Sequence, residues 1–241
     1  MSGRLLGVGV GPGDPELVTL KAVRALREAD LVVHFAKNGS PSHARAIAAD
    51  HLKPGVEELP LSYPLTREVP RESGTYRDAL RQFYDDAAAR LAAQLDAGRV
   101  VAVICEGDPL FYGSYMHLHV RLSARYPTEV VAGVTGMSGC WSAAGAPIAQ
   151  GDDVFVVLPA TLPETAIERR LIDADAAVVM KLGPHLPKIR RALTRLGLIE
   201  RAIYVERGST KGAVMMRLAD KHDDAAPYFA IVLVPGWEER A

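Results

Sequence analysis

The stretch VVAVIC at residues 100–105 constrains the fold of this chain more than any other segment. It is apolar throughout, which is typical of a strand that is covered on both faces and therefore belongs to a parallel sheet flanked by helices. Comparable runs recur along the chain. They predict further strands at residues 4–10, 30–35, 56–61, 129–134, 153–159, 176–183, 202–208 and 228–236.

Helical patterns alternate with these runs, which predicts an α/β fold with largely parallel pairing. The clearest helix is predicted at residues 75–95, where apolar residues recur at helical spacing and Gly98 follows as a cap. Another is expected from Pro15 through residue 28, capped by Asp14. Tyr126-Pro127 interrupts the pattern, so we predict two α/β domains, residues 1–125 and 126–241.

Gly-Asp-Pro occurs twice directly after predicted strands, at residues 13–15 and 107–109. The simplest interpretation is a turn and a helix start, since Gly allows a tight turn, Asp caps and Pro suits the first helical position. The alternative is that both turns face one ligand, because open α/β sheets bind ligands beyond the carboxyl ends of their strands. The spacing weakly favours the second interpretation.

The opening GVGVGPGDPE is not a dinucleotide-binding fingerprint. That fingerprint requires Gly-x-Gly-x-x-Gly, and starting from Gly7, Gly9 or Gly11 the third glycine position is occupied by another residue. The prolines of this loop lack amides that could bind phosphate, and Asp14 would repel it. The loop instead suits a ligand that is cationic or neutral at the contact. S-adenosylmethionine, which carries a sulfonium, an ammonium and hydroxyls, has these properties.

Six segments in this order resemble the tetrapyrrole methylases, the methyltransferases of sirohaem and corrin synthesis. They are GVGVGPGDPELVTLKA, CEGDPLFYGSY, GVTGMSG, VVMKLG, YVERGS and YFAIVLVPG, and they span nearly the whole chain. Within the family, KPGVEELPLSYPLT, EGDPLFYGSYMHLHVRL and LPATLPE are most similar to the branch that methylates precorrin-2 at C20 in cobalamin synthesis.

The resemblance implies a two-domain homodimer that holds S-adenosylmethionine between its domains, with the first glycine-rich turn shaping a trough for the tetrapyrrole. Cofactor contacts then follow from the matching segments. They are Pro12, Glu106, Gly107, Asp108, Pro109, Phe111, Thr135, Gly136, Met180, Lys181, Leu182, Arg207, Gly208, Ser209, Val234 and Pro235. The chain departs from the family pattern at Ala132, where Pro is usual, and at residues 35–37, which leaves the substrate detail there open.

Methyl transfer from a sulfonium to an electron-rich meso carbon requires alignment and exclusion of water rather than a catalytic triad. A base is needed only for the meso proton after attack. Tyr112, on the loop after residue 105, is the first candidate for that step, and His34, Tyr63 and Glu106 are alternatives. Each of the four has an ordinary structural interpretation as well. No metal site is predicted.

The tetrapyrrole substrate that the resemblance implies carries carboxylates, which arginine binds through paired donors. Candidates for this role are Arg67, Arg71, Arg77, Arg81, Lys181, Lys188 and Arg207, although most surface cations only face solvent.

The net charge of −1 provides no overall basic field, which disfavours the RNA-modifying members of the family. The two cysteines lack metal-ligand spacing, and no long apolar stretch occurs, so we expect a cytoplasmic protein that binds neither nucleic acid nor membrane. Three alternatives remain: cobalt-bearing rather than metal-free substrate, a macromolecular substrate, and a nucleotide-dependent oxidoreductase. The oxidoreductase is disfavoured because the glycines of the opening loop do not have the spacing of a dinucleotide-binding fingerprint.

Overall fold

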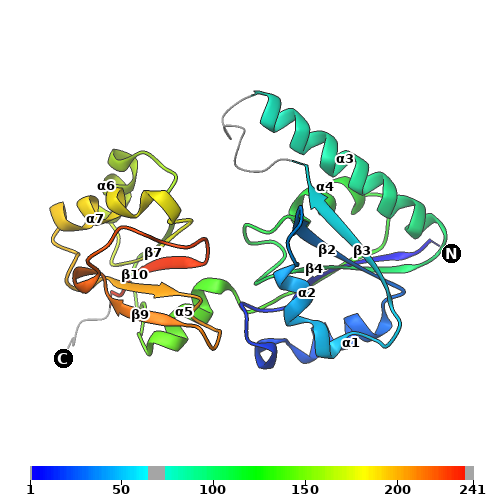
Figure 1. Ribbon diagram of the computed structural model, residues 1–241, viewed down its shortest axis with the longest axis horizontal. Helices are drawn as coiled ribbons and strands as arrows, with labels where there is room; N and C mark the ends of the chain where they lie inside the picture. The colour runs from blue at the N-terminus through cyan, green and yellow to red at the C-terminus, as the bar shows by residue number, and fades with distance from the viewer. Residues whose placement is uncertain (1, 65–73, 237–241) are drawn as a thin grey trace. The chain divides into compact units, whose positions relative to one another are not determined.

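The computed structural model describes residues 2–64 and 74–236, which fold as two compact units, Met1–Thr135 and Gly136–Ala241 (Figure 1). Each unit contains one five-stranded sheet and its own hydrophobic core. The expectation of two α/β units is therefore met within the described residues, and each unit is considered by itself below.

The sheet of the first unit is parallel at every described pairing, as the apolar strand at residues 100–105 predicted. Its strand order is β3-β2-β4-β1-β5. The strands are β1 (Arg4–Gly9), β2 (Leu31–Lys37), β3 (Glu57–Tyr63), β4 (Val100–Cys105) and β5 (Thr128–Val131). Because β4, β1 and β5 are adjacent and parallel, their carboxyl ends meet at one edge of the sheet.

Helices cover both faces of this sheet (Figure 1). On one face, α3 (Gly74–Asp96) and α4 (Tyr115–Leu122) bury Leu91, Leu95 and Leu118 against β4. On the other face, α1 (Leu20–Glu28) and α2 (His43–Ile47) pack Leu26 and Ile47 beside Ile104 and other strand residues. A short 3-10 turn, Ala49–His51, follows α2. The helix predicted at residues 75–95 is confirmed.

The single helix predicted from Pro15 to residue 28 is in fact two elements. Asp14 caps only a 3-10 turn, Pro15–Leu17, and the backbone then becomes extended at Val18. The helix α1 starts afresh, with the Thr19 hydroxyl accepting a hydrogen bond from the Ala22 amide at 3.1 Å. The sequence does not predict that a new helix begins at this threonine, because threonine occurs both within helices and at their N-caps.

The sheet of the second unit is mixed, unlike the largely parallel pairing that was expected. Its order is β6-β7-β10-β8-β9, with β6 and β7 parallel and the other three pairings antiparallel. The strands are β6 (Phe155–Pro159), β7 (Ala176–Met180), β8 (Ile203–Glu206), β9 (Val214–Arg217) and β10 (Ala230–Val234). The exposed edge strand β9 was not predicted.

Helices α6 (Glu164–Ile172) and α7 (Leu186–Arg195) cover one face of this second sheet, and α5 (Gly136–Ala144) covers the other. Alternation along β7 separates the two cores, since Val179 packs with the α6 and α7 side and Val178 with the α5 side. Short 3-10 turns lie at Gly183–His185 and Leu218–Asp220.

Strand β5 assigns the segment after Tyr126 to the first unit, because Leu5 to Val8 of β1 pair with Thr128 to Val131. The boundary that was expected at residue 126 is therefore replaced by one after Thr135. The Tyr126-Pro127 break follows the turn after α4 and lies inside the first unit.

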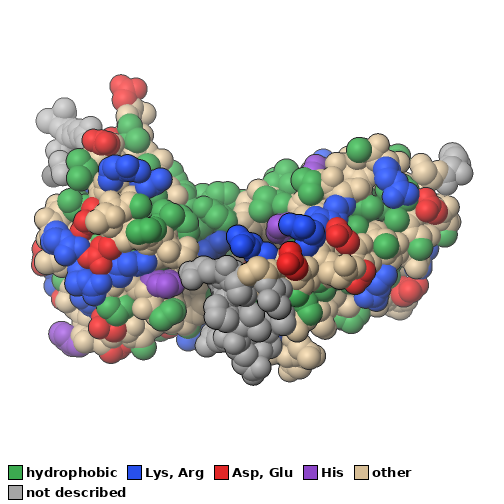
Figure 2. All heavy atoms as spheres, turned by 90° about the horizontal axis from the view of Figure 1, so that it is seen from above, with side chains coloured by type: hydrophobic (Ala, Val, Ile, Leu, Met, Phe, Trp, Pro, Cys, Tyr) green, Lys and Arg blue, Asp and Glu red, His purple; other side chains and the backbone are tan. Residues whose placement is uncertain are grey.

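Within the described segments, no helix is both long enough and apolar enough to cross a membrane. Acidic and basic side chains are interspersed on the face of the molecule drawn in Figure 2.

Candidate active site

Both Gly-Asp-Pro turns lie at the same edge of the first sheet. The last residues of β1 and β4 are in register, Gly9 with Cys105. Beyond them the Val10 amide donates to the Cys105 carbonyl at 2.9 Å, and the Gly107 amide donates to the Gly11 carbonyl at 2.7 Å. The two loops are thus hydrogen-bonded to each other just past the strand ends, where open α/β sheets bind ligands.

The loop after β5 completes this edge. The Gly133 amide donates to Oδ2 of Asp108 at 3.1 Å, which connects the β5 loop to the β4 loop. A methyl group on Gly9 would lie 2.6 Å from the Gly107 carbonyl oxygen and 2.6 Å from the Gly133 nitrogen. Glycine is therefore required here for the close approach of three backbone segments. We call residues 9–15, 106–114 and 132–135 the strand-end loops.

The two aspartates of the repeated motif make different contacts. Asp14 Oδ1 accepts from the Glu16 amide at 2.9 Å, and Asp108 Oδ1 accepts from the Leu110 amide at 2.9 Å, so the local turn is the same. Asp108 uses its second oxygen for Gly133, whereas the described hydrogen bonds of Asp14 are confined to its own turn. Both oxygens of Asp108 therefore hold the loops in place.

Tyr112, the first candidate for proton transfer, lies on the β4 loop with φ of 54° and a relative exposure of 46%. Its ring meets Phe111 edge-on, with centroids 4.9 Å apart. A non-glycine residue in the left-handed region is strained and is held there by its surroundings. The loop thus fixes the position of Tyr112. A neutral phenol, however, must lose its own proton before it can accept another.

Glu106 immediately follows β4 and precedes Gly107. Its carboxyl is half-buried, and burial raises its pKa to about 7. Among the described residues, no hydrogen bond or ion pair to this carboxylate is observed, and no charged neighbour is a cause of the shift. By contrast, the carboxylate of Asp108, two residues further along the same loop, accepts hydrogen bonds from two backbone amides.

Aromatic side chains gather where β2 and β3 end. Phe35 stacks on Tyr63 with ring centroids 5.7 Å apart, and Phe83 of α3 lies 5.3 Å from Tyr63. The Tyr63 hydroxyl is hydrogen-bonded to the Ser114 hydroxyl at the start of α4. Burial raises the pKa of Tyr63, so it remains protonated at neutral pH and is a poor base. Tyr63 was predicted as a site residue from the sequence, but Phe83 and Ser114 were not, because they lie beside Tyr63 only through tertiary packing.

His34 is buried on β2 and lies beside an ion pair. Its Nε2 is 3.6 Å from the Glu58 carboxylate, which accepts two hydrogen bonds from Arg45 at 2.8 and 2.9 Å. Burial lowers the pKa of His34, and its Nδ1 has no hydrogen-bond partner in the described part of the chain. This arrangement stabilises the contact between β3 and α2, and it leaves His34 a weaker candidate for proton transfer than Glu106.

In the second unit, the segments after β7 and β8 share one edge of the sheet. Both strands pair antiparallel with β10, so they run in the same direction and end on the same side. Lys181 and Arg207 stand there with φ of 60° and 47°. In the described ranges the non-glycine residues with positive φ are Tyr112, Lys181 and Arg207, each within a segment predicted to contact the cofactor. Such strain clusters at functional sites.

Gly208 belongs to a close packing contact with α5 in this unit, whereas a methyl group on Gly136 would meet nothing within 4 Å. A methyl group on Gly208 would lie 2.8 Å from both Cα and Sγ of Cys140, so α5 approaches the β8 loop closely. Burial raises the pKa of Cys140 to about 11, which keeps it protonated and supports the expectation that it packs rather than reacts. Thr135 precedes Gly136, the first residue of α5.

Val234 and Pro235 lie at the other edge of the second sheet from the β7 and β8 loops. Val234 pairs with Ala177 near the start of β7, while Met180, Lys181 and Leu182 are at its end. The antiparallel direction of β10 causes this separation, and the segment order alone did not reveal it. Val234 and Pro235 are therefore separated along the sheet from the other predicted contacts of this unit, whereas Ala230 is the β10 residue that pairs with Glu206.

The cations proposed for substrate carboxylates have varied surroundings. Arg77 and Arg81 are exposed on α3, and Arg67 and Arg71 lie outside the described residues. Lys188 donates to the Leu162 carbonyl at 2.6 Å, and Arg207 lies 3.5 Å from the Glu206 carboxylate. Lys188 is thus part of the second unit's internal bonding and is a weaker substrate ligand than was expected.

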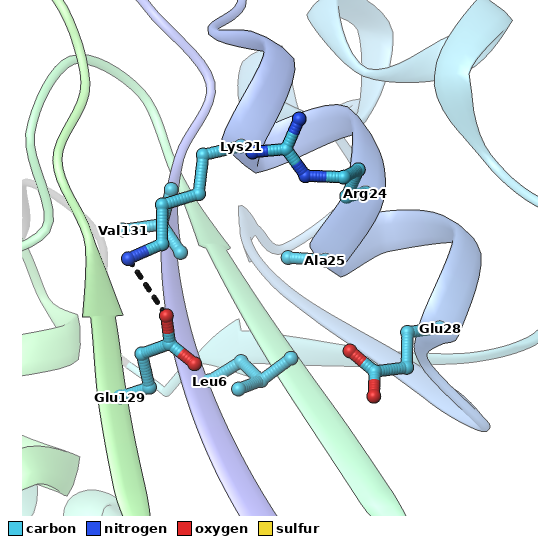
Figure 3. Close-up of a pocket in the computed structure, with 7 residues that line it drawn as sticks. All are labelled: Leu6, Lys21, Arg24, Ala25, Glu28, Glu129 and Val131. Carbon is cyan, nitrogen blue, oxygen red and sulfur yellow. Dashed lines mark ion pairs between the residues drawn. The ribbon is translucent and has the colours of Figure 1, made fainter.

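A separate pocket lies between α1 and the β1 and β5 strands (Figure 3). Lys21 and Glu129 form an ion pair at 2.7 Å across it, and Glu28 pairs with Arg4. None of the predicted site residues lines this pocket. Within the described segments, no group of three or more His, Cys, Asp or Glu side chains could hold a metal ion.

Comparison with known proteins gives a consistent result. The profile of the Tetrapyrrole (Corrin/Porphyrin) Methylases matches residues 4–219. The chain is 58% identical to a precorrin-2 C(20)-methyltransferase of Sinorhizobium sp, covering 99% of this chain and 97% of that protein. It is 30% identical to a cobalt-precorrin-2 C(20)-methyltransferase of Salmonella typhimurium, covering 99% of each.

Among solved structures, a uroporphyrin-III C-methyltransferase from Thermus thermophilus, complexed with S-adenosylhomocysteine, superposes with a TM-score of 0.66 at 26% identity. The match covers 97% of this chain and 92% of that one. The sequence match extends through both units, and the fold match does so independently. The chain is a methyltransferase and belongs to the tetrapyrrole (corrin/porphyrin) methylase family.

Proposed function

We propose that the protein transfers a methyl group from S-adenosylmethionine to C20 of precorrin-2, giving precorrin-3A in cobalamin biosynthesis. The observation that carries this proposal is the 58% identity, over nearly the full length of both proteins, to a precorrin-2 C(20)-methyltransferase. The identity to the cobalt-precorrin-2 enzyme is 30%, which favours the metal-free substrate. The cobalt-bearing substrate is the second candidate, since both relatives act at C20.

The strand-end loops suit a cofactor with cationic and neutral contacts. Prolines at residues 12, 15 and 109 remove amides that a phosphate would use, and Gly9 lets the backbone segments of this edge approach closely. We assign the first-unit cofactor contacts to Pro12, Gly107, Pro109, Phe111 and Thr135. Asp108 positions the loops, through its bonds to Leu110 and Gly133.

The second unit contributes the edge where β7 and β8 end. We assign contacts there to Met180, Lys181, Leu182, Arg207 and Ser209, with Gly136 at the start of α5. Gly208 has a supporting role, because it lets Cys140 of α5 approach the β8 loop. The strained backbone at Lys181 and Arg207 supports a functional role for both turns.

The cofactor supplies an activated methyl group on a sulfonium, which needs no further activation by the protein. The residues of the chain align the meso carbon with the methyl group and exclude water. The aromatic rings of Phe35, Tyr63 and Phe83 offer an apolar surface of the kind that a flat macrocycle packs against. Arg77 and Arg81, on the same helix as Phe83, are retained as candidates for the carboxylates at its rim.

We further propose that the enzyme acts in the cytoplasm as a homodimer, without nucleic acid or membrane partners. A formal net charge of −1 and the interspersed surface charges of Figure 2 support a small-molecule substrate over RNA. We also propose that the tetrapyrrole trough lies in the first unit and that the second unit supplies much of the cofactor contact.

An anaerobic incubation with methyl-labelled S-adenosylmethionine tests the proposal. Precorrin-2 with and without inserted cobalt is supplied, and products are identified by mass spectrometry and carbon NMR. One labelled methyl at C20 of the metal-free ring is the expected result. Preference for the cobalt form would assign the enzyme to the second candidate function. Binding of S-adenosylhomocysteine without transfer to either ring would contradict both substrates while leaving the family assignment intact.

A further inference from the structure

Two carboxylates, Glu106 and Asp108, lie two residues apart on the β4 loop, and only one of them is available for chemistry. Asp108 accepts from the Leu110 amide at 2.9 Å and from the Gly133 amide at 3.1 Å, so both of its oxygens are engaged with backbone donors. The bond to Gly133 ties the β4 loop to the β5 loop, so Asp108 serves to position the strand-end loops.

Glu106 has the opposite surroundings. It is half-buried at the carboxyl end of β4, and its neighbours there include the Gly107 amide, which is already bonded to the Gly11 carbonyl. In the described residues its carboxylate has neither a hydrogen-bonded nor an ion-paired partner. Two nearby carboxylates in different environments are the usual arrangement when one group positions and the other moves a proton.

The reaction needs one proton acceptor at this edge of the sheet. When C20 attacks the methyl carbon, the bond from carbon to sulfur breaks and C20 then carries both a hydrogen and the new methyl group. Loss of that hydrogen as a proton returns the electron pair of the C20–H bond to the conjugated ring. No oxidant or reductant is involved, and the only further requirement is a base.

We propose that Glu106 is this base: its carboxylate accepts the C20 proton after methyl transfer, while Asp108 positions the loop. The proposal rests on the function proposed above, and it replaces Tyr112 as the first candidate. Tyr112 and Tyr63 are phenols, and His34 of β2 faces the ion pair of Glu58 on β3 and Arg45 on α2.

Other titratable groups lie on β4, on its loop and on the neighbouring elements. They include Cys105 on β4, Asp108 on the same loop, Asp14 on the β1 loop, Tyr115, His117 and His119 on α4, and His34 on β2. Burial raises the pKa of Cys105 to about 12 and raises that of Tyr115 as well, so both stay neutral near pH 7. Burial alone brings Glu106 to about 7, where a group is partly ionised at neutral pH and accepts a proton efficiently.

Glu106→Gln removes the base and keeps the size of the side chain. Anaerobic single-turnover assays with precorrin-2 are expected to show precorrin-3A formation slowed by about 100-fold, within the range of general base catalysis. The wild-type rate should rise with pH through an apparent pKa near 7, and the variant should lose that dependence. Affinity for S-adenosylhomocysteine, measured by calorimetry, should change less than about twofold.

Glu129→Gln is the matched control, because Glu129 makes its ion pair with Lys21 in the pocket of Figure 3, away from the strand-end loops. It should keep the wild-type rate and pH profile. Glu106→Asp should recover part of the activity.

The outcomes separate the two proposals. Wild-type protein that transfers no methyl to precorrin-2 overturns the proposed function and the role of Glu106 together. Active wild-type protein, with a Glu106→Gln variant of unchanged rate and pH profile, overturns only the role of Glu106. A variant that is slow but retains the pH dependence also overturns it, since the lost activity then has a structural cause.

Discussion

The two Gly-Asp-Pro turns of this protein have the same local geometry and different tertiary roles. In each, the aspartate accepts from the amide two residues later at 2.9 Å. Only Asp108 also binds a different strand-end loop, through Gly133 at 3.1 Å. The first turn starts a 3-10 segment on the way to α1, while the second holds the loops around Glu106 and Tyr112. A short motif therefore specifies a turn, and its place in the sheet decides its function.

The largest effect is expected where the two turns approach each other. Gly9→Ala would place a methyl group 2.6 Å from both the Gly107 carbonyl oxygen and the Gly133 nitrogen, and these backbone atoms cannot easily move. We expect the free energy of unfolding to fall by about 3 kcal/mol, as for severe overpacking. Urea denaturation measures it. Gly74→Ala is the control, because a methyl group there meets nothing within 4 Å; equal losses in both variants would contradict the packing account.

Asp108→Ala comes next, because it removes two hydrogen bonds to backbone amides that have no other described partner. The expected loss in the free energy of unfolding is about 2 kcal/mol, mostly from the unsatisfied Gly133 amide. Asp108→Asn should retain part of it, since its amide oxygen can accept one of the bonds. Denaturation curves that superpose on the wild type would show that the Gly133 contact is not formed in solution.

A smaller, pH-dependent effect on stability is expected from Glu106. Its pKa is raised from 4.5 to about 7 in the folded state, so folding favours the protonated form. The stability it contributes is complete below pH 4.5 and is lost as pH rises through 7. Discounted for partial exposure, the loss between pH 5 and pH 8 is about 1–2 kcal/mol.

Glu106→Gln should abolish this loss, so the variant should be more stable than the wild type at pH 8 and similar to it at pH 5. Thermal unfolding at the two pH values measures the difference. A wild-type curve and a variant curve that shift in parallel with pH would mean that Glu106 is ordinarily solvated.

Asp14→Ala should have the smallest effect of these changes. Only the cap of the 3-10 turn Pro15–Leu17 is lost, which is expected to cost about 0.5–1 kcal/mol. The same denaturation assay applies. A loss in the free energy of unfolding as large as that of Asp108→Ala would show that the two turns do not differ in their contribution to stability.

The sequence alone predicted the elements whose signal is local. The helix Gly74–Asp96 follows from apolar residues on one face, and β4 from a wholly apolar run. Features that depend on distant partners were missed. The restart of α1 at Thr19 depends on a cap that resembles any helical threonine, and the edge strand β9 is short and exposed. Strand direction in the second sheet has no sequence signature, so the separation of Val234 and Pro235 from the ends of β7 and β8 was not predicted.

In the candidate site, too, local features were predicted and features that depend on distant residues were not. The motifs identified the loops that contain Tyr112, Lys181 and Arg207, and each of these residues proved to have a strained backbone. The relative roles of Glu106 and Asp108 were not predictable, because they depend on burial of one carboxylate and on the amide of Gly133 for the other. Tyr63 was identified without its partner Ser114, which lies 51 residues away in sequence.

The most direct test of the difference between the two turns is calorimetric titration of S-adenosylhomocysteine into Asp108→Ala and Asp14→Ala, each first shown to be folded by circular dichroism. We expect Asp108→Ala to weaken binding by about 10- to 100-fold, which corresponds to about 1.4–2.8 kcal/mol, and Asp14→Ala to stay within about twofold of the wild type. Equal weakening in both variants, or wild-type affinity in Asp108→Ala, would contradict the different roles of the two turns.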